Sequence, residues 1–148
     1  MTTQQLVVDL ENEPGRLFTV TEAIALAGIN VHALALSDNG QTGTARMLVS
    51  DVRRARSLVM ELDVPARTED VLLIEIPDTP GSLAALLEPL FDDYVNIVSL
   101  NAFSAFDGRA VAVIRFTDNP QAEGILREHG HEPLDIGAVF PAVAEDEE

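Results

Sequence analysis

The fold is decided by a segment that the chain contains twice. Residues 7–37 read VVDLENEPGRLFTVTEAIALAGINVHALALS, and residues 73–103 read LIEIPDTPGSLAALLEPLFDDYVNIVSLNAF. The two align without a gap, and identical residues pair Pro14 with Pro80, Gly15 with Gly81, Leu17 with Leu83 and Asn30 with Asn96. Backbone geometry restricts residue choice most at turns and helix ends. The few identities therefore indicate an internal duplication at an offset of 66 residues.

Each copy predicts a strand, a helix and a second strand. The apolar runs at 6–10 and 72–76 are typical of short strands, and a proline then opens each helix. A period of about 3.6 residues gives each helix one apolar face, at Leu17, Val20, Ile24 and Ala27 and at Leu83, Leu86, Leu87, Leu90 and Phe91. Pro89 should kink or shorten the second helix. The second strands run from Asn30 to about Ser37 and from Asn96 to about Ser104.

The remaining elements also recur, at an offset of 67 residues. Glycine-containing turns at 39–43 and 107–108 lead to third strands at 44–49 and 109–116. Helices with one apolar side follow, and short closing strands are expected near 65–69 and 132–136. The order β-α-β-β-α-β, present twice, predicts the α+β class, with two ferredoxin-like units whose antiparallel sheets carry helices on one face.

The expected domains are 1–69, 70–140 and a frayed acidic tail at 141–148. A unit of about 65 residues buries little of its surface and is marginally stable alone. The strands at 31–36 and 110–114 are apolar on both faces apart from His32, and such strands are usually covered on both sides. The cover could be the other repeat, a second chain, or both. We expect a homodimer, because two units in one chain still leave sheet edges open.

Charge and composition exclude several classes of function. The net charge is −16, from 25 acidic residues and nine basic residues, all arginine, so nucleic acid and anionic membranes are not expected partners. Residues 1–66 contribute −3 and residues 67–148 contribute −13. The chain has no cysteine, which excludes thiol catalysis and thiolate metal sites. It shows neither a signal peptide nor an apolar run of about 20 residues, and we expect a soluble cytoplasmic protein.

The candidate site lies in two matching loops, Asn12-Glu13-Pro14-Gly15 and Asp78-Thr79-Pro80-Gly81. The first residue can cap the amides that follow, the proline restricts φ, and the glycine permits close approach to the backbone. The free N–H groups of Leu17 and Phe18, or of Leu83 and Ala84, then face outward at the positive end of a helix dipole, where a carboxylate can bind. The amides of Asn30 and Asn96 offer donors and acceptors where the next strand begins. A zwitterionic amino acid needs donors for its carboxylate and acceptors for its ammonium group.

These features also have a purely structural interpretation. A Pro-Gly loop before a helix is common turn chemistry, and an asparagine after a helix is a common C-terminal cap. The recurrence of both features at one offset favours ligand binding.

The loop, the helix that ends in Gly28-Ile29-Asn30 and the order of elements resemble the ACT domain, a ligand-binding regulatory module. The resemblance covers nearly the whole chain, as in a tandem protein made of ACT domains alone and without a catalytic domain. It implies that effectors, mostly amino acids, bind at interfaces between ACT units, near the loop after the first strand and the start of the second. It assigns ligand binding to Asn12, Pro14, Gly15, Leu17, Phe18, Asn30, Asp78, Pro80, Gly81, Leu83, Ala84 and Asn96. The second copy departs from the first at 92–95, where two aspartates could hinder an anionic group, so the first site is favoured.

Other constellations are not expected to carry chemistry, and no metal or cofactor is predicted. His129-Gly130-His131 has ligand-like spacing without a cysteine or a clear carboxylate partner. Arg53, Arg54 and Arg56 are expected on a solvated helix face. Ser37 and Ser104 lack the histidine and aspartate that a nucleophile needs, and no phosphate loop is present.

The leading hypothesis is therefore a non-catalytic amino-acid sensor. Apolar and small neighbours of the loop favour an aliphatic or aromatic ligand, at Leu17, Ala33, Leu34, Ala35 and Leu36. One alternative is a regulatory subunit that docks on a biosynthetic enzyme without an effector of its own. Another is a small enzyme such as a phosphatase, for which Arg16 would be the only basic candidate beside the loop.

Overall fold

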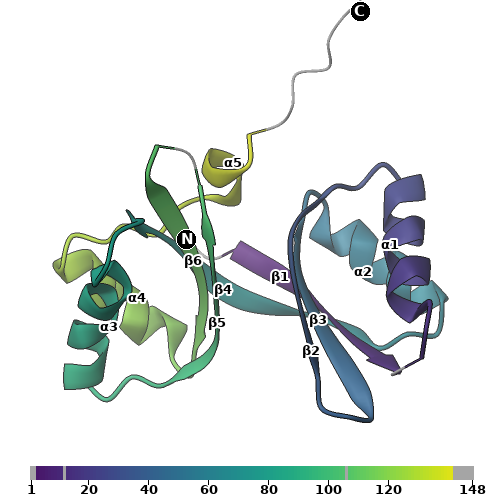
Figure 1. Cartoon of the computed structure of the whole chain (residues 1–148), viewed down its shortest axis with the longest axis horizontal. Helices are drawn as coiled ribbons and strands as arrows, with labels where there is room; N and C mark the ends of the chain where they lie inside the picture. Colours follow the sequence, from purple (N-terminus) through teal and green to yellow (C-terminus); the bar gives the residue numbers. More distant parts are fainter. Residues whose placement is uncertain (1–2, 12, 106, 142–148) are drawn as a thin grey trace, which may run out of the picture. The chain divides into compact units, whose positions relative to one another are not determined.

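The computed structural model describes residues 3–11, 13–105 and 107–141, which form two compact units. The N-terminal unit comprises Gln4–Glu69, and the C-terminal unit contains the chain from Asp70 (Figure 1). Of the acidic tail expected at 141–148, only Pro141 lies within the described residues. None of the helices in this part of the chain is long and apolar enough to cross a membrane.

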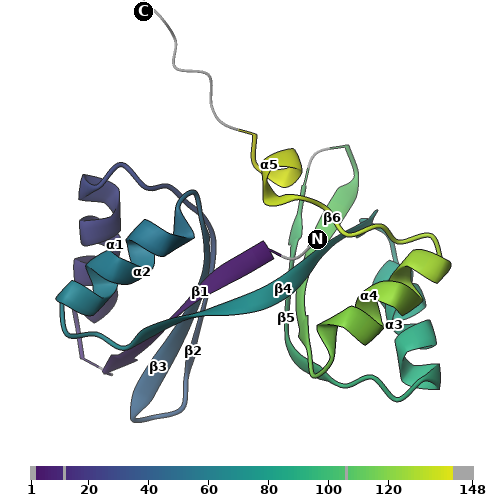
Figure 2. The same cartoon turned by 180° about the vertical axis from the view of Figure 1, so that it is seen from behind.

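The N-terminal unit has the predicted β-α-β-β-α-β order. Its elements are β1 (Thr3–Glu11), α1 (Arg16–Leu26), β2 (Val31–Asp38), β3 (Thr42–Val49), α2 (Val52–Glu61) and the start of β4 (Ala66–Pro77). β3 lies between β1 and β2 and is antiparallel to both. The Asp9 N–H donates to the Pro65 carbonyl at 3.1 Å, beside the start of β4. Helices α1 and α2 both cover one face of this sheet (Figure 2).

The C-terminal unit repeats this arrangement. After β4 come α3 (Ser82–Asp92), β5 (Ile97–Ser104), β6 (Arg109–Phe116), α4 (Asn119–Glu128) and a short α5 (Ile136–Val139). β6 lies between β4 and β5 and is antiparallel to both. The register of β2 shifts between Val31 and Ala33, and that of β5 shifts at the matching place between Ile97 and Ser99. The predicted α+β class and the duplication are confirmed. The two copies also share the register shift near the start of their second strands.

Each unit has its own apolar core between the helices and one face of the sheet. Alternate residues of the central strands point into it, as the period-2 geometry of strands requires. In the N-terminal unit these include Leu6, Val8, Leu10, Ala45, Met47 and Val49, against Val20, Ile24, Ala55 and Val59 of the helices. In the C-terminal unit they include Leu72, Ile74, Ile76, Ala112 and Ile114, against Leu86, Leu90, Ala122 and Leu126.

The helix ends follow matched local signals. Asp51 and Asp118 cap α2 and α4, because their carboxylates accept from the Arg54 and Gln121 N–H groups at 3.2 and 2.9 Å. One residue past the C-cap of α1 lies a left-handed residue, Gly28. Its N–H donates to the Ala25 carbonyl, and the Ile29 N–H donates to that of Ile24. This is a Schellman motif. Asn30 lies beyond it, so the interpretation of Asn30 as the helix cap is wrong.

The first closing strand differs from the prediction, and Pro89 does not shorten its helix. Residues 66–69 do not form a separate strand, because they continue into the first strand of the second copy as β4. Pro89 lies inside α3, but that helix has 11 residues, the same length as α1, so it is not shortened. Pro89 sits late in the helix, and its missing N–H removes one bond, to the carbonyl of Ala85.

The second closing strand, expected at 132–136, is absent from the described residues. Leu134 makes one rung beside β4, its N–H donating to the Leu73 carbonyl at 2.8 Å. The preceding residue, Pro133, has no N–H to offer, and the chain turns into α5 instead. The Phe140 ring then stacks on Phe103 of β5, with centroids 5.7 Å apart and planes at 25°. Phe103 pairs with Val111, so this contact lies on the sheet face opposite α3 and α4.

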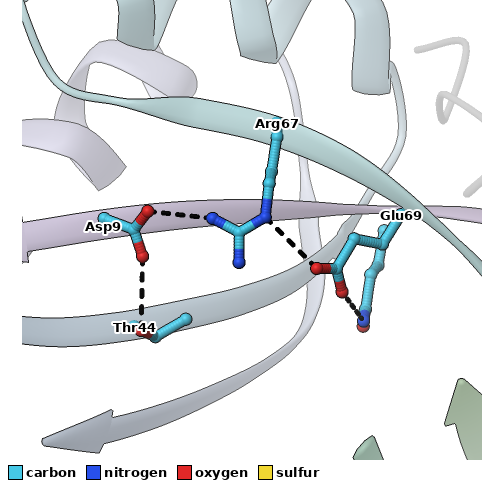
Figure 3. A network of polar contacts seen from close by, with 5 residues as sticks. Asp9, Thr44, Arg67 and Glu69 are labelled. Carbon is cyan, nitrogen blue, oxygen red and sulfur yellow. Dashed lines mark hydrogen bonds and ion pairs between the residues drawn. The ribbon is translucent and has the colours of Figure 1, made fainter. Parts of the chain in front are cut away.

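The corresponding face of the N-terminal sheet carries a polar network (Figure 3). Arg67 donates to Asp9 at 2.8 Å and to Glu69 at 3.2 Å, and Thr44 donates to the other Asp9 oxygen at 3.3 Å. Glu69 and Gln5, which is 2% exposed, approach to 3.5 Å. Asp9, on β1, and Thr44, on β3, are cross-strand partners, and this network joins them to the start of β4.

Candidate functional site

Both Pro-Gly loops form the same turn. Gly15 has φ 87° and ψ −7°, and Gly81 has φ 85° and ψ −8°, the values of the third residue of a type II β-turn. The turn closes in each copy, because the Arg16 N–H donates to the Glu13 carbonyl and the Ser82 N–H to that of Thr79. The sequence predicted the glycine requirement. It wrongly placed the prolines in the first helical turn, since α1 begins at Arg16 and α3 at Ser82.

The expected cap by the first loop residue is wrong for the second copy. Gly81 is the N-cap of α3 and no side chain caps the helix. The Asp78 carboxylate instead accepts from the Ser104 hydroxyl at 2.8 Å. Asn12, its counterpart, lies outside the described residues.

The first amides of α1 and α3 have no partner inside their helices. Leu17 and Phe18 are the second and third residues of α1, and Leu83 and Ala84 hold these places in α3. N–H groups at these positions have no carbonyl four residues earlier in the helix to bond. Phe18 and Ala84 are exposed, so both helix ends offer donors at a positive dipole end.

The N-terminal unit has a hollow of about 140 Å³ directly beside its Pro-Gly loop. Its apolar residues are Leu10, Leu17 and Leu36, and its charged residues are Glu11, Glu13, Arg16 and Asp38. The register explains the gathering, because Leu10 and Asp38 both pair with Gly43 at one end of the sheet. Sequence reasoning missed the three carboxylates. The position of Asp38 at a strand end was the available signal.

The hollow is lined by three carboxylates and one guanidinium group, which is already paired. Arg16 donates to Glu11 at 3.1 Å and lies 3.5 Å from Glu13, so its charge is shared between two acids. This pairing disfavours the phosphatase alternative, which needs Arg16 to face an anion. The remaining acceptors suit an ammonium group.

The second loop has different chemistry at the same places. Pro77, Thr79, Ser82 and Ser104 stand where the first copy has Glu11, Glu13, Arg16 and Asp38. Thr79 and Ser82 form a hydroxyl pair at 2.7 Å. The second loop therefore offers the helix amides without the carboxylates.

Asn30 and Asn96 lie at the opposite end of their own sheets from the loops. β2 begins beside Asn30 and reaches the loop end only at Asp38, about 23 Å away for seven strand residues. The backbone of Asn30 is held by Ser50, with N–H to Oγ at 2.9 Å, and the Asn96 carbonyl accepts from the Thr117 N–H at 3.0 Å. The two side chains are exposed. Within one unit, loop and asparagine do not meet.

The histidines line a different hollow. His129 and His131, with Glu88, Pro89 and Asp92, surround a space of about 270 Å³ between α3 and the end of α4. Across residues 3–11, 13–105 and 107–141, no three metal-binding side chains are grouped to hold an ion. In the other unit, burial lowers the pKa of His32. Among the three arginines of α2, Arg54 donates to the Ala27 carbonyl at 3.1 Å and so supports the end of α1.

A family of known proteins matches most of the chain. The family described as an ACT domain pair spans residues 1–130. The chain belongs to this family, which confirms the predicted tandem of ACT domains, a regulatory fold.

Solved structures share the architecture. Protein BT0572 from Bacteroides thetaiotaomicron is 31% identical, with 95% of this chain and 97% of that one covered and a TM-score of 0.89. The ligand-free regulatory subunit of aspartate kinase from Thermus thermophilus is 17% identical over 87% of this chain and 91% of that one, with a TM-score of 0.62. The corresponding subunit from Thermus flavus is 20% identical over 84% and 88%, with a TM-score of 0.60. The last two show likeness of fold alone. No curated protein matches the chain.

Proposed function

We propose that this protein is a non-catalytic cytoplasmic regulator that binds a free amino acid at its Pro-Gly loops. The observation that carries the proposal is the hollow beside the first loop. Carboxylates and apolar side chains line it together with Arg16 and Leu17, the first two residues of α1. A zwitterion with an apolar side chain requires acceptors, apolar contacts and N–H donors, the last of which a helix N-terminus offers.

Each part of the ligand has a stated place. The ligand carboxylate binds the N–H groups of Leu17 and Phe18 at the helix N-terminus. Its ammonium group faces Glu11, Glu13 or Asp38, and its side chain lies on Leu10, Leu17 and Leu36. A hollow of 140 Å³ is close to the roughly 150 Å³ that encloses benzene in an engineered cavity, so a small or medium amino acid fits.

We assign Asn30 and Asn96 to the ligand through a second copy of the chain. They cannot reach the loop of their own unit, and their side chains are exposed, where a neighbour could contact them. β2 also favours a second copy, because Leu34 and Leu36 are 40% and 51% exposed on this edge strand. The homodimer expected from the sequence supplies this arrangement.

A thermal-shift panel of the twenty amino acids tests the function. A ligand at 100 times its Kd should stabilise the fold by about 2.7 kcal/mol. The absence of a shift with every amino acid at millimolar concentration would contradict the proposal.

A pair of variants tests the binding mode. Phe18→Pro and Phe18→Ala both remove the exposed ring, but only the proline removes the N–H that we assign to the carboxylate. Binding should be lost in Phe18→Pro and kept in Phe18→Ala, by calorimetry. Ala84→Pro and Ala84→Gly make the same comparison in α3. Loss of binding in Asn30→Ala, with a dimer intact by light scattering, would support the contribution of the second copy.

Binding of the ligand would act on a partner, for which we propose an enzyme of amino-acid metabolism. This fold forms the regulatory subunit of aspartate kinase in the Thermus proteins. Co-purification with and without the stabilising amino acid tests this step. A partner enzyme that binds the chain equally well with and without every amino acid would favour the alternative, in which the chain docks on the enzyme without an effector of its own.

A further inference from the structure

The second Pro-Gly loop is held from the hairpin between β5 and β6. The Asp78 N–H donates to the Gly108 carbonyl at 2.7 Å, and the Asp78 carboxylate accepts from the Ser104 hydroxyl at 2.8 Å. Ser104 is the last residue of β5. The conformation of this loop therefore depends on where that strand ends.

The end of β5 is in turn held by the C-terminal segment, residues 134–140. This segment is attached at two points, because Leu134 bonds to β4 and the Phe140 ring stacks on Phe103, the neighbour of Ser104. Between them lies α5, whose N-cap Asp135 accepts from the Gly137 N–H through its carboxylate. Figures 1 and 2 both show α5 on the side of this sheet away from α3 and α4.

The described residues of the first repeat make different contacts at the corresponding strand end. Ser37 and Asp38 stand where the second repeat has Phe103 and Ser104. Ser37 has no ring to stack, and the Asp38 carboxylate accepts from the Gly40 N–H at 2.8 Å within its own hairpin. The two loops share one turn geometry but are supported differently.

We infer that Phe140, Phe103 and Ser104 are positioning residues for the second loop, so that the C-terminal segment controls the second amino-acid site and leaves the first unaffected. The stack fixes the end of β5, and Ser104 passes this constraint to Asp78. The effect on amino-acid affinity rests on the proposed function, whereas the effect on the conformation of the second loop does not. Displacing the segment, by a partner or by a change to the C-terminus, would weaken the second site only.

Hydrogen–deuterium exchange of the full chain, without ligand, tests the inference. Phe140→Ala should raise exchange in peptides covering 77–84 by about fivefold, the size of effect expected for loss of one aromatic pair. Peptides covering 13–18 should not change. Ser104→Ala should raise exchange in 77–84 as well, while residues 134–140 stay protected, because Ser104 acts after the stack.

Matched variants separate positioning from general stability. Val139→Ala shortens a side chain of the same segment outside the stack, and Ser37→Ala removes a hydroxyl near the end of β2 in the first repeat. Both should leave 77–84 unchanged, and Phe140→Tyr, which keeps a ring, should restore protection. Unchanged exchange at 77–84 in both Phe140→Ala and Ser104→Ala would overturn the inference. So would an equal rise in both loops, which would show general destabilisation.

Binding measurements then address the regulatory step. With the amino acid found in the thermal-shift panel, Phe140→Ala should weaken one class of site about fivefold and leave the other unchanged. Equal affinities in Phe140→Ala and wild type would overturn this step. If wild type binds no amino acid, the proposed function fails, and the exchange experiment still decides whether the segment positions the loop.

Discussion

Gly28 and Tyr94 occupy equivalent positions, one residue past the C-caps of α1 and α3, and both have positive φ, 76° and 56°. Only glycine adopts this conformation without a steric penalty. We expect Gly28→Ala to lower the free energy of unfolding by about 1 kcal/mol and Tyr94→Gly to raise it by about 1 kcal/mol. Urea denaturation measures both.

Gly124 provides the control for this pair. It lies inside α4 without a positive φ, and a methyl group there would meet no atom within 4 Å. Gly124→Ala should therefore stabilise the protein by about 0.5–1 kcal/mol. A Gly28→Ala variant that is stabilised like Gly124→Ala would contradict the role given to the left-handed backbone.

The ion pair of Glu75 and Arg109 makes a pH-dependent contribution. The hydrogen bond from Arg109, at 2.7 Å, lowers the pKa of Glu75 below its ordinary value of 4.5. A lowered folded-state pKa stabilises the protein above the unfolded pKa, and this contribution is lost as the pH falls through the folded value. The stability difference between wild type and Arg109→Met should be constant near pH 7 and shrink below about pH 4.5. Denaturation curves at several pH values check this, and a pH-independent difference would contradict it.

The sequence correctly predicted the glycines that the backbone conformation requires. Gly15 and Gly81 recur because a type II turn needs positive φ at that place. The sequence did not predict the partner of Asp78. A carboxylate can cap a helix or accept from a distant hydroxyl, and only the folded hairpin brings Ser104 within reach.

Among the elements, β4 depends on the polar network that joins it to β1. Glu69 is 7% exposed, and Arg67 donates to it at 3.2 Å (Figure 3). Removing Arg67 leaves that carboxylate buried and removes a bond to Asp9. We expect Arg67→Met to lower the free energy of unfolding by about 2 kcal/mol, the range for hydrogen bonds to charged groups. Chemical denaturation checks the value.

Arg16→Met is the matched control, because Arg16 also contacts two carboxylates but in an exposed setting. Such surface pairs contribute less than about 1 kcal/mol. Equal losses in the two variants would show that burial of Glu69 does not matter.

The order and type of most elements followed from periodicity and turn residues, and the errors lie at the ends of the repeats. The first closing strand continues into the next copy as β4. At the corresponding place in the second copy, Leu134 makes one backbone hydrogen bond to Leu73, and the chain then turns into α5 and stacks Phe140 on Phe103. This contact joins distant segments, and a local pattern does not encode it.

For the whole molecule, the duplication predicted two similar units, and the resemblance predicted that both are ACT domains. The two units differ in the residues beside their loops. Asp38 is far from Glu11 and Glu13 in the sequence, and it lies beside the same hollow because β1 and β2 both end opposite the start of β3. Alignment of the two copies identifies the matching loops, but it does not show which carboxylates lie beside the first loop in the fold. The first site is expected to bind a zwitterion more tightly, since Glu11, Glu13 and Asp38 lie beside its loop, whereas Pro77, Thr79 and Ser104 take these places in the second copy.

An NMR titration of the isotope-labelled chain with the amino acid that stabilises it tests whether this ligand binds at the helix N-termini beside the Pro-Gly loops. We expect the amide signals of Leu17 and Phe18 to shift first, and those of Leu83 and Ala84 at higher concentration. Saturable shifts confined to other parts of the chain, or none at all, would contradict this expectation.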